Sequence, residues 1–150
     1  MANKKVFVSG TYDILHAGHI KFFKDARALG GHLTVCSASS EVIKLSKKRT
    51  SALPDRHKLA IIGELRCVDK ALISSDLDPV FDFLGHWKRD GAPDILAVTD
   101  DDRNAERKRA VCRDYGVELV VLPKTPPSAD EPEPISTTAI RKRIKADQGV

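Results

Sequence analysis

Five short runs of β-branched and apolar residues recur along the chain, and longer stretches with helical spacing separate them. The runs cover residues 6–8, 33–35, 71–73, 95–98 and 119–122. Parallel strands need a crossover of helix length between them, so this alternation favours a parallel sheet. We therefore predict an α/β fold with a doubly wound, parallel five-stranded sheet. A chain of 150 residues has the size of one domain, so a single domain over residues 1–150 is expected.

The segments between the runs indicate where the helices lie. An apolar stripe from Ile20 to Leu29 ends at Gly30-Gly31, as a helix with a glycine stop does. Further helices are predicted over 54–67, 79–87, 103–115 and 137–145. Five prolines in 123–134 remove backbone donors, so this Pro-rich segment is predicted to be a loop, either a lid bordering the active site or a tether.

Charge and composition narrow the classes of partner. The formal charge of +4 suits an anionic ligand, while aromatic residues are only 5% and do not alternate with basic ones, which argues against nucleic acid. Cys36, Cys67 and Cys112 lie far apart, as expected of a protein of the reducing cytoplasm rather than a disulfide framework. No apolar run approaches the length of a membrane span, so no membrane partner is expected.

The densest motif is Ser9-Gly10-Thr11-Tyr12-Asp13-Ile14-Leu15-His16-Ala17-Gly18-His19, between the first predicted strand and helix. Gly10 permits a tight turn, Gly18 lets a phosphate approach the backbone, and the helix start offers free N–H groups. His16 and His19 can each donate an N–H to one phosphate. Helix capping and core packing are the structural alternatives for such histidines.

Two motifs together resemble those of a known family. His16-Ala17-Gly18-His19 is similar to the HxGH signature of the cytidylyltransferase-like nucleotidyltransferases, and the segment 135–141, Ile-Ser-Thr-Thr-Ala-Ile-Arg, resembles their ISTT block. The likeness is greatest to glycerol-3-phosphate cytidylyltransferase, with heptose-phosphate adenylyltransferase domains and archaeal FAD synthetases as more distant relatives. This resemblance implies a Rossmann-like sheet of the HUP type, Mg²⁺ or Mn²⁺ as cofactor, and a homodimer.

The resemblance also implies roles for individual residues. The catalytic residues it implies are His16, His19 and Lys47. Nucleotide-binding roles fall on Gly10, Thr11, Tyr12, Gly18, Arg49, Asp100, Asp101, Ser136, Thr137 and Thr138. Acceptor-binding roles fall on Asp13, Lys58, Arg66 and Lys124. Metal ligands are not assigned.

Several of these residues could also have an ordinary structural role instead of a role in binding or catalysis. The hydroxyls of 136–138 can cap a helix as well as form, with Arg141, a second anion site. The basic run of Lys44, Lys47, Lys48 and Arg49 after the second strand can be solvated surface. The carboxylates of 100–102 can hold Mg²⁺, bind a base or ribose, or simply favour a helix N-terminus.

The predicted reaction is transfer of CMP from CTP to a small phosphate or phosphonate acceptor, similar to glycerol 3-phosphate, with release of pyrophosphate. One alternative is adenylyl transfer from ATP to a sugar phosphate or to FMN; another is a nucleotide-sensing module without turnover. Three departures from the family pattern leave acceptor and nucleobase open: Thr99 replaces a usual glycine, Lys58 replaces a helix arginine, and the Pro-rich insertion separates Lys124 from Ile135.

Overall fold

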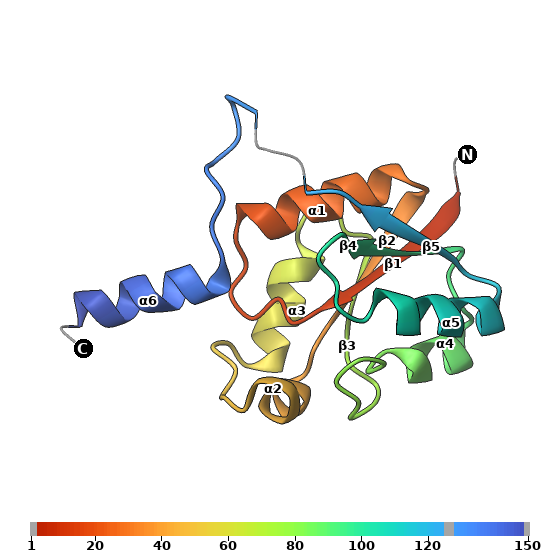
Figure 1. The fold of residues 1–150 in the computed structure, drawn as a ribbon, viewed down its shortest axis with the longest axis horizontal. Helices are drawn as coiled ribbons and strands as arrows, with labels where there is room; N and C mark the ends of the chain where they lie inside the picture. The colour runs from red at the N-terminus through yellow and green to blue at the C-terminus, as the bar shows by residue number, and fades with distance from the viewer. Residues whose placement is uncertain (1–2, 125–127, 149–150) are drawn as a thin grey trace.

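A five-stranded parallel sheet forms the centre of the protein (Figure 1), in a computed structural model that describes residues 3–124 and 128–148. The strands are β1 (Lys4–Gly10), β2 (Gly31–Ser37), β3 (Lys70–Ile73), β4 (Ile95–Thr99) and β5 (Glu118–Leu122). Their order is β3-β2-β1-β4-β5, and every pair is parallel. The predicted doubly wound, Rossmann-like parallel sheet is confirmed.

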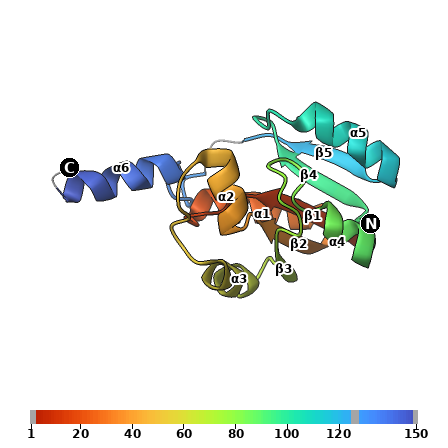
Figure 2. The same cartoon turned by 90° about the horizontal axis from the view of Figure 1, so that it is seen from below.

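Helices cover both faces of this sheet. Side chains alternate along β1, so Val6 and Val8 pack towards α1 (Ala17–Ala28) and α3 (Asp55–Gly63), whereas Phe7 packs towards the other face. That other face is covered by α4 (Leu84–Asp90) and α5 (Ala105–Tyr115), as Figure 2 shows. The two hydrophobic cores fix the sheet between two helical layers.

The strand order places a topological switch point between β1 and β4. The chain leaves β1 for β2 on one side and later returns to β4 on the other, so the connections after β1 and β4 run to opposite sides. In open α/β sheets, ligands bind at such a switch point, outside the carboxyl ends of the strands. The loop 11–16 after β1 and the loop 100–104 after β4 both start from this edge.

Helices α2 and α4 depart most from the sequence-based expectations, and α3 ends at Gly63, before the predicted residue 67. Helix α2 (Ser40–Lys47) was not predicted, yet the Ser39 hydroxyl accepts the Val42 N–H as its N-cap and Val42 and Ile43 are buried. Lys47 therefore ends a helix and does not belong to a loop. Helix α4 starts later than predicted because the Asp78 carboxylate accepts two backbone N–H groups and turns the chain before it.

The last helix, α6 (Thr137–Asp147), extends away from the body of the protein (Figures 1 and 2) and runs past the predicted end at residue 145. None of its residues is buried. Residues 125–127 of the Pro-rich loop lie outside the described residues. Within the part of the chain that the structure describes, no helix combines the length and the apolar character that crossing a membrane requires.

Candidate active site

The two histidines of the first motif stand together at the start of α1. Their ring centroids are 3.9 Å apart and the rings are stacked. His16 is the N-cap of α1, and its Nδ1 accepts the Gly18 N–H at 3.1 Å. The Nδ1 of His19 accepts the His16 N–H at 3.3 Å, which closes a reciprocal capping box. Both histidines therefore cap the helix through Nδ1, and the Nε2 atom of each ring takes no part in the cap.

These backbone contacts decide the chemical form of both rings. A nitrogen that accepts an N–H cannot carry a proton, so each neutral imidazole holds its proton on Nε2. Burial lowers the pKa of His16, and burial together with the neighbouring His16 ring lowers the pKa of His19 to about 4. At neutral pH the site thus presents two uncharged Nε2–H donors at the positive end of a helix.

Tyr12 supports this pair from inside the protein. Its ring packs edge-on against His19 at 5.4 Å and against Phe23 at 5.0 Å, and only 6% of the residue is exposed. The Tyr12 side chain therefore belongs to the core in this structure, and nucleotide binding at this position stays a prediction for its backbone. Its φ of 43° lies in the left-handed region, which non-glycine residues rarely adopt outside functional turns.

The backbone around Gly10 and Thr11 is held by the end of β2. The Gly10 carbonyl accepts the Ala38 N–H at 2.8 Å, and the Thr11 carbonyl accepts the Ser37 hydroxyl at 3.1 Å. A side chain at position 10 would meet the Tyr12 ring at 2.7 Å. The Tyr12 ring therefore fills the space that a Cβ at position 10 would need, and a glycine is required at this point of the turn.

Asp13 joins two segments that are distant in the sequence, residues 49–52 and helix α6. Its carboxylate accepts the Ser51 hydroxyl at 2.9 Å and the Ala52 N–H at 2.7 Å through Oδ1. Through Oδ2 it pairs with Arg49 at 3.4 Å and with Arg141 of α6. Burial alone would raise its pKa, but the hydrogen bonds from Ala52, Arg141 and Ser51 outweigh burial and lower it.

The start of α6 docks against the histidine loop. The Thr137 hydroxyl donates to the Ile14 carbonyl at 3.3 Å, and the Ser136 hydroxyl accepts the Ala139 N–H at 3.1 Å as the N-cap. Thr138 is exposed. The structure thus brings the two family motifs together, with capping at Ser136 and an open, hydroxyl-bearing helix start beside it.

A second polar group lies beyond β4 and β5. Lys124 donates its backbone N–H to Asp100 at 3.1 Å and its ammonium to Asp101 at 2.5 Å. Asp101 also accepts the Thr99 hydroxyl at 2.6 Å. The hydrogen bond from Lys124 is the largest cause that lowers the pKa of Asp101. These residues share the carboxyl edge of the sheet with the histidine loop.

The structure places two of the predicted acceptor-binding residues, Lys58 and Arg66, in different surroundings. Lys58 is fully buried, and its ammonium donates to the Ala38 carbonyl at 2.6 Å just beyond the end of β2, so its binding to the acceptor stays a prediction that this packing does not support. Arg66 precedes β3 and lies in the turn before Asp69, whose N–H donates to the Leu33 carbonyl near the start of β2. Arg66 is therefore near the opposite edge of the sheet, away from the histidine loop of its own chain, and its acceptor-binding role stays a prediction.

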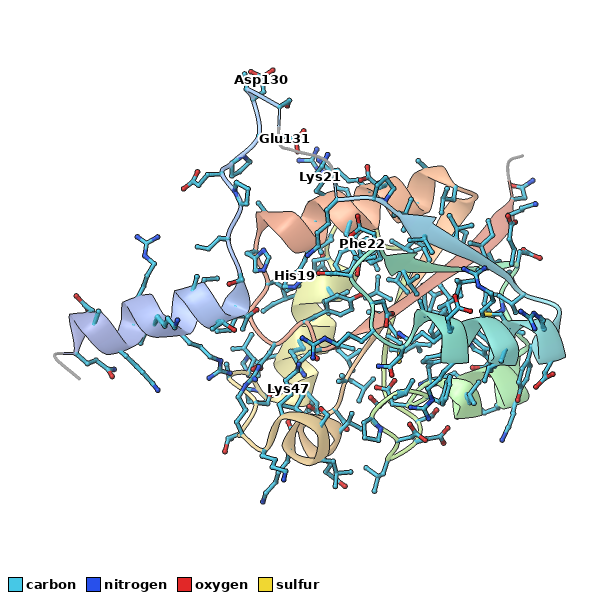
Figure 3. The ribbon with its side chains drawn as sticks, viewed as in Figure 1. His19, Lys21, Phe22, Lys47, Asp130 and Glu131 are labelled. Carbon is cyan, nitrogen blue, oxygen red and sulfur yellow. The ribbon has the colours of Figure 1, made fainter. Side chains whose placement is uncertain are left out.

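Lys47 and the described part of the Pro-rich loop lie on different sides of His19 (Figure 3). Lys47 is exposed at the end of α2. In the loop, Glu131 forms an ion pair with Lys21 of α1 at 3.3 Å. The loop therefore passes beside the helix that carries the histidines, in keeping with a segment that borders the site.

Comparison with known proteins decides the family. Residues 7–143 match the family described as Cytidylyltransferase-like. The chain belongs to the cytidylyltransferase-like family. It is thus a nucleotidyltransferase by family, which confirms the resemblance seen in the HxGH and ISTT motifs.

Several relatives of this cytidylyltransferase-like chain share the name FAD synthase. The FAD synthase of Methanosarcina barkeri is 35% identical over 141 residues, which cover 93% of this chain and 95% of the relative. The FAD synthase of Korarchaeum cryptofilum is 32% identical over 148 residues, which cover 95% and 92%.

Solved structures support the fold alone. A lipopolysaccharide core biosynthesis protein from Thermoplasma volcanium superposes with a TM-score of 0.66 at 24% identity and covers 83% of this chain and 98% of its own. Pantoate-beta-alanine ligase from Francisella tularensis superposes with a TM-score of 0.60 at 14% identity, covering 97% and 70%. Both likenesses agree with a Rossmann-like sheet of the HUP type.

The described residues of this cytidylyltransferase-like chain do not build a metal centre. Within residues 3–124 and 128–148, no three His, Cys, Asp or Glu residues cluster as metal ligands would. Both oxygens of Asp101 already accept hydrogen bonds, and one oxygen of Asp100 does too. The described residues therefore show no ready-made Mg²⁺ or Mn²⁺ cage, and the metal cofactor stays a prediction.

Sequence reasoning missed the partners of Asp13. Ser51 and Ala52 lie far along the chain from Asp13, and nothing in their sequence marks them. Arg141 could be connected to the hydroxyl segment because it stands one helical turn after Thr137. Its pairing with Asp13 becomes visible only when α6 is placed against the loop after β1.

Proposed function

We propose that this chain is an adenylyltransferase that joins the AMP part of ATP to the phosphate of FMN and releases pyrophosphate. The observation that carries the proposal is the set of relatives named FAD synthase, at 30–35% identity over 79–95% of the chain. The geometry supports nucleotidyl transfer in general, because two motifs from opposite ends of the chain meet at one edge of the sheet.

The proposed reaction is an in-line displacement at the α-phosphorus of ATP. An oxygen of the FMN phosphate forms the new P–O bond, and the bond between the α-phosphorus and the oxygen that bridges to the β-phosphorus breaks. A phosphate monoester loses its second proton near pH 6, so the attacking oxygen is already ionised at neutral pH. Catalysis then rests on alignment and on stabilising charge on the oxygens.

The histidine pair supplies donors for that charge. The Nε2–H groups of His16 and His19 are fixed in direction by the contacts of their Nδ1 atoms with the backbone. A preorganised, neutral N–H donor stabilises negative charge without needing to be protonated during the reaction. Lys47 and Arg49 would line the triphosphate, and Thr138 with the open start of α6 would receive its outer phosphates.

Asp100, Asp101 and Lys124 would bind the base, the ribose or the acceptor, on the side of the site next to β4 and β5. Mg²⁺ or Mn²⁺ would enter with ATP, held by phosphate oxygens and water, since Mg²⁺ usually keeps several waters at nucleotide sites. The homodimer stays a prediction, which gel filtration with light scattering tests.

An activity matrix tests the proposal. The purified chain is incubated with ATP or CTP against FMN, glycerol 3-phosphate, a hydroxyalkyl phosphonate or a sugar phosphate, and released pyrophosphate is measured. Pyrophosphate release with ATP and FMN, together with FAD detected by chromatography, is the expected result. Release only with CTP and glycerol 3-phosphate would restore the reading favoured by the sequence. Nucleotide binding without release from any pair would indicate a sensing module.

A matched pair of variants shows that any turnover belongs to this site. His16→Asn keeps a side-chain acceptor for the helix cap but lacks the Nε2–H donor, and Gly63→Ala alters α3 at an open position. We expect loss of FAD formation in the first variant and full activity in the second. Equal activity in both would place the reaction elsewhere.

A further inference from the structure

The carboxylate of Asp13 cannot bind an acceptor directly. Its side chain is only 1% exposed, so no substrate can reach it without a rearrangement. Four donors surround its two oxygens, from Ser51, Ala52, Arg49 and Arg141. An ionised carboxylate offers about four lone-pair sites, so all of them are occupied. The acceptor-binding role expected for Asp13 is therefore excluded in this arrangement.

The two carboxylate oxygens of Asp13 contact different groups. Oδ1 accepts the Ser51 hydroxyl and the Ala52 N–H, which anchors the connection between α2 and α3. Oδ2 faces two guanidinium groups, Arg49 from that connection and Arg141 from α6. One oxygen therefore fixes the backbone, and the other holds two cations that come from distant parts of the chain.

Both arginines keep donors that the protein does not use. Among the described residues, the Nε atoms of Arg49 and Arg141 are buried from water and have no hydrogen-bond partner. An unpaired buried donor costs free energy, and such groups in a native structure call for an explanation. A ligand cannot reach those Nε atoms in this arrangement, but each guanidinium contacts Asp13 through Nη2 alone and about a third of each arginine side chain is exposed, so the outer edge of each guanidinium can still receive a phosphate.

The position of this pair points to a polyphosphate. Asp13 lies three residues before His16 in the loop after β1, and Arg141 belongs to the helix whose Thr137 contacts the same loop at Ile14. Helix α6 buries none of its own residues, so few contacts other than these two fix where it lies. The arginine pair therefore stands beside the histidines, on the side where the nucleotide's outer phosphates would lie.

We infer that Asp13 is a positioning residue, which holds Arg49 and Arg141 side by side so that their free N–H groups receive the β- and γ-phosphates of the nucleoside triphosphate. The inference rests on the proposed function for the identity of the ligand. It assigns to Asp13 an action through the arginines, without contact to substrate.

The variant Asp13→Asn keeps the contacts of one carboxylate oxygen and removes those of the other. Its carbonyl oxygen can still accept from Ser51 and Ala52, whereas its amide nitrogen meets the arginines as a donor facing donors. Removing the carboxylate also adds one positive charge to the site, which by itself strengthens polyanion binding. Weaker binding in this variant therefore cannot come from long-range charge and has to come from lost positioning.

Binding of ATP and of pyrophosphate is measured by calorimetry at 0.15 M salt, for wild type and Asp13→Asn. The same comparison is made in a background that carries Arg49→Ala and Arg141→Ala. We expect affinity to fall about tenfold or more in the wild-type background, as for one hydrogen bond to a charged group. In the arginine-free background we expect a change of less than about twofold. Ser51→Ala is the control, expected to bind both ligands as wild type does.

Unchanged or tighter binding by Asp13→Asn would overturn the inference, and so would an equal loss in both backgrounds. Should Asp13→Asn fail to fold, Arg141→Lys replaces it, because α6 has no buried residues and a single ammonium cannot serve Asp13 and a phosphate together. Pyrophosphate binding by Arg141→Lys equal to wild type would then refute the inference. Because binding is measured without FMN, failure to form FAD leaves this result standing and counts only against the proposed function.

Discussion

The rings of His16 and His19 stack 3.9 Å apart while each Nδ1 accepts a backbone N–H at the start of α1. The same atoms that cap the helix therefore determine the tautomer that a phosphate would meet. Capping and phosphate binding are usually weighed against each other as alternatives for such histidines. Here the first prepares the second, because a capped Nδ1 leaves the proton on Nε2.

The two roles of His16 can be separated by substitution. His16→Asn retains a good N-cap, whereas His16→Ala removes both the cap and the Nε2–H donor. We expect turnover to fall about 10²–10³-fold in both variants, as on loss of one oxyanion donor. Only His16→Ala should also lose stability, by about 1 kcal/mol, in urea unfolding. Turnover in His16→Asn close to wild type would remove the histidine from the catalytic set.

The lowered pKa of His19 predicts how stability depends on pH. Its folded pKa of about 4 lies below the unfolded value of 6.5, so the unfolded chain takes up the proton first as the pH falls. The contribution of His19 to the free energy of unfolding is complete above about pH 6.5. It is lost progressively between about pH 6.5 and 4.

Urea unfolding of wild type and His19→Gln between pH 7.5 and 4.5 measures this effect, since glutamine keeps the capping contact but does not titrate. The comparison with His19→Gln isolates the effect of His19. Burial also raises the pKa of Asp82 to about 6, which makes the stability of both proteins change with pH in the opposite direction. We expect the stability of His19→Gln to fall less over this window. Parallel pH curves for the two proteins would show that His19 is not neutral and buried as described.

A methyl group at Gly10 tests whether the Tyr12 ring holds His19 in place. The added Cβ would meet the Tyr12 Cζ at 2.7 Å and force the ring away from His19. We expect Gly10→Ala to lose about 1–3 kcal/mol of stability by overpacking. Turnover should fall on the order of tenfold to a hundredfold, as for a misplaced catalytic group.

Gly63→Ala is the matched control for Gly10→Ala. Its Cβ would lie 3.9 Å from the Ala71 Cβ, an ordinary contact, at the end of α3. Stability should stay equal or rise slightly, because alanine favours a helix over glycine. Full turnover in Gly10→Ala, at reduced stability, would mean that Tyr12 serves the core alone.

Local patterns in the sequence predict the sheet well. The β-branched runs are long enough and regular enough to give all five strands and their parallel arrangement. Helix α2 was missed because its basic last turn resembles solvated loop, although Ser39 followed by the apolar Val42 and Ile43 is an N-terminal signal. Short helices in polar surroundings are the weakest case for periodicity.

The site was less predictable because its contacts join distant segments. The pairing of Asp13 with Arg141 spans 128 residues, and no local pattern encodes it. The position of Lys58 in the family pattern indicates a ligand, yet Lys58 stands four residues before the buried Ile62 and so shares the inward face of α3. The sequence identifies chemical groups, and only the packing of helices decides which way they face.

Lys58 and Lys47 provide a final, crossed prediction. The buried ammonium of Lys58 is the donor to the Ala38 carbonyl, so Lys58→Met should lower the free energy of unfolding by about 1–3 kcal/mol and leave the KM for FMN unchanged. Lys47 is exposed, so Lys47→Met should change stability by less than about 0.5 kcal/mol but reduce kcat if it neutralises the triphosphate. Urea unfolding and steady-state kinetics on both proteins decide. A raised KM for FMN in Lys58→Met, at full stability, would return that lysine to the acceptor site and show that α3 turns in the working enzyme.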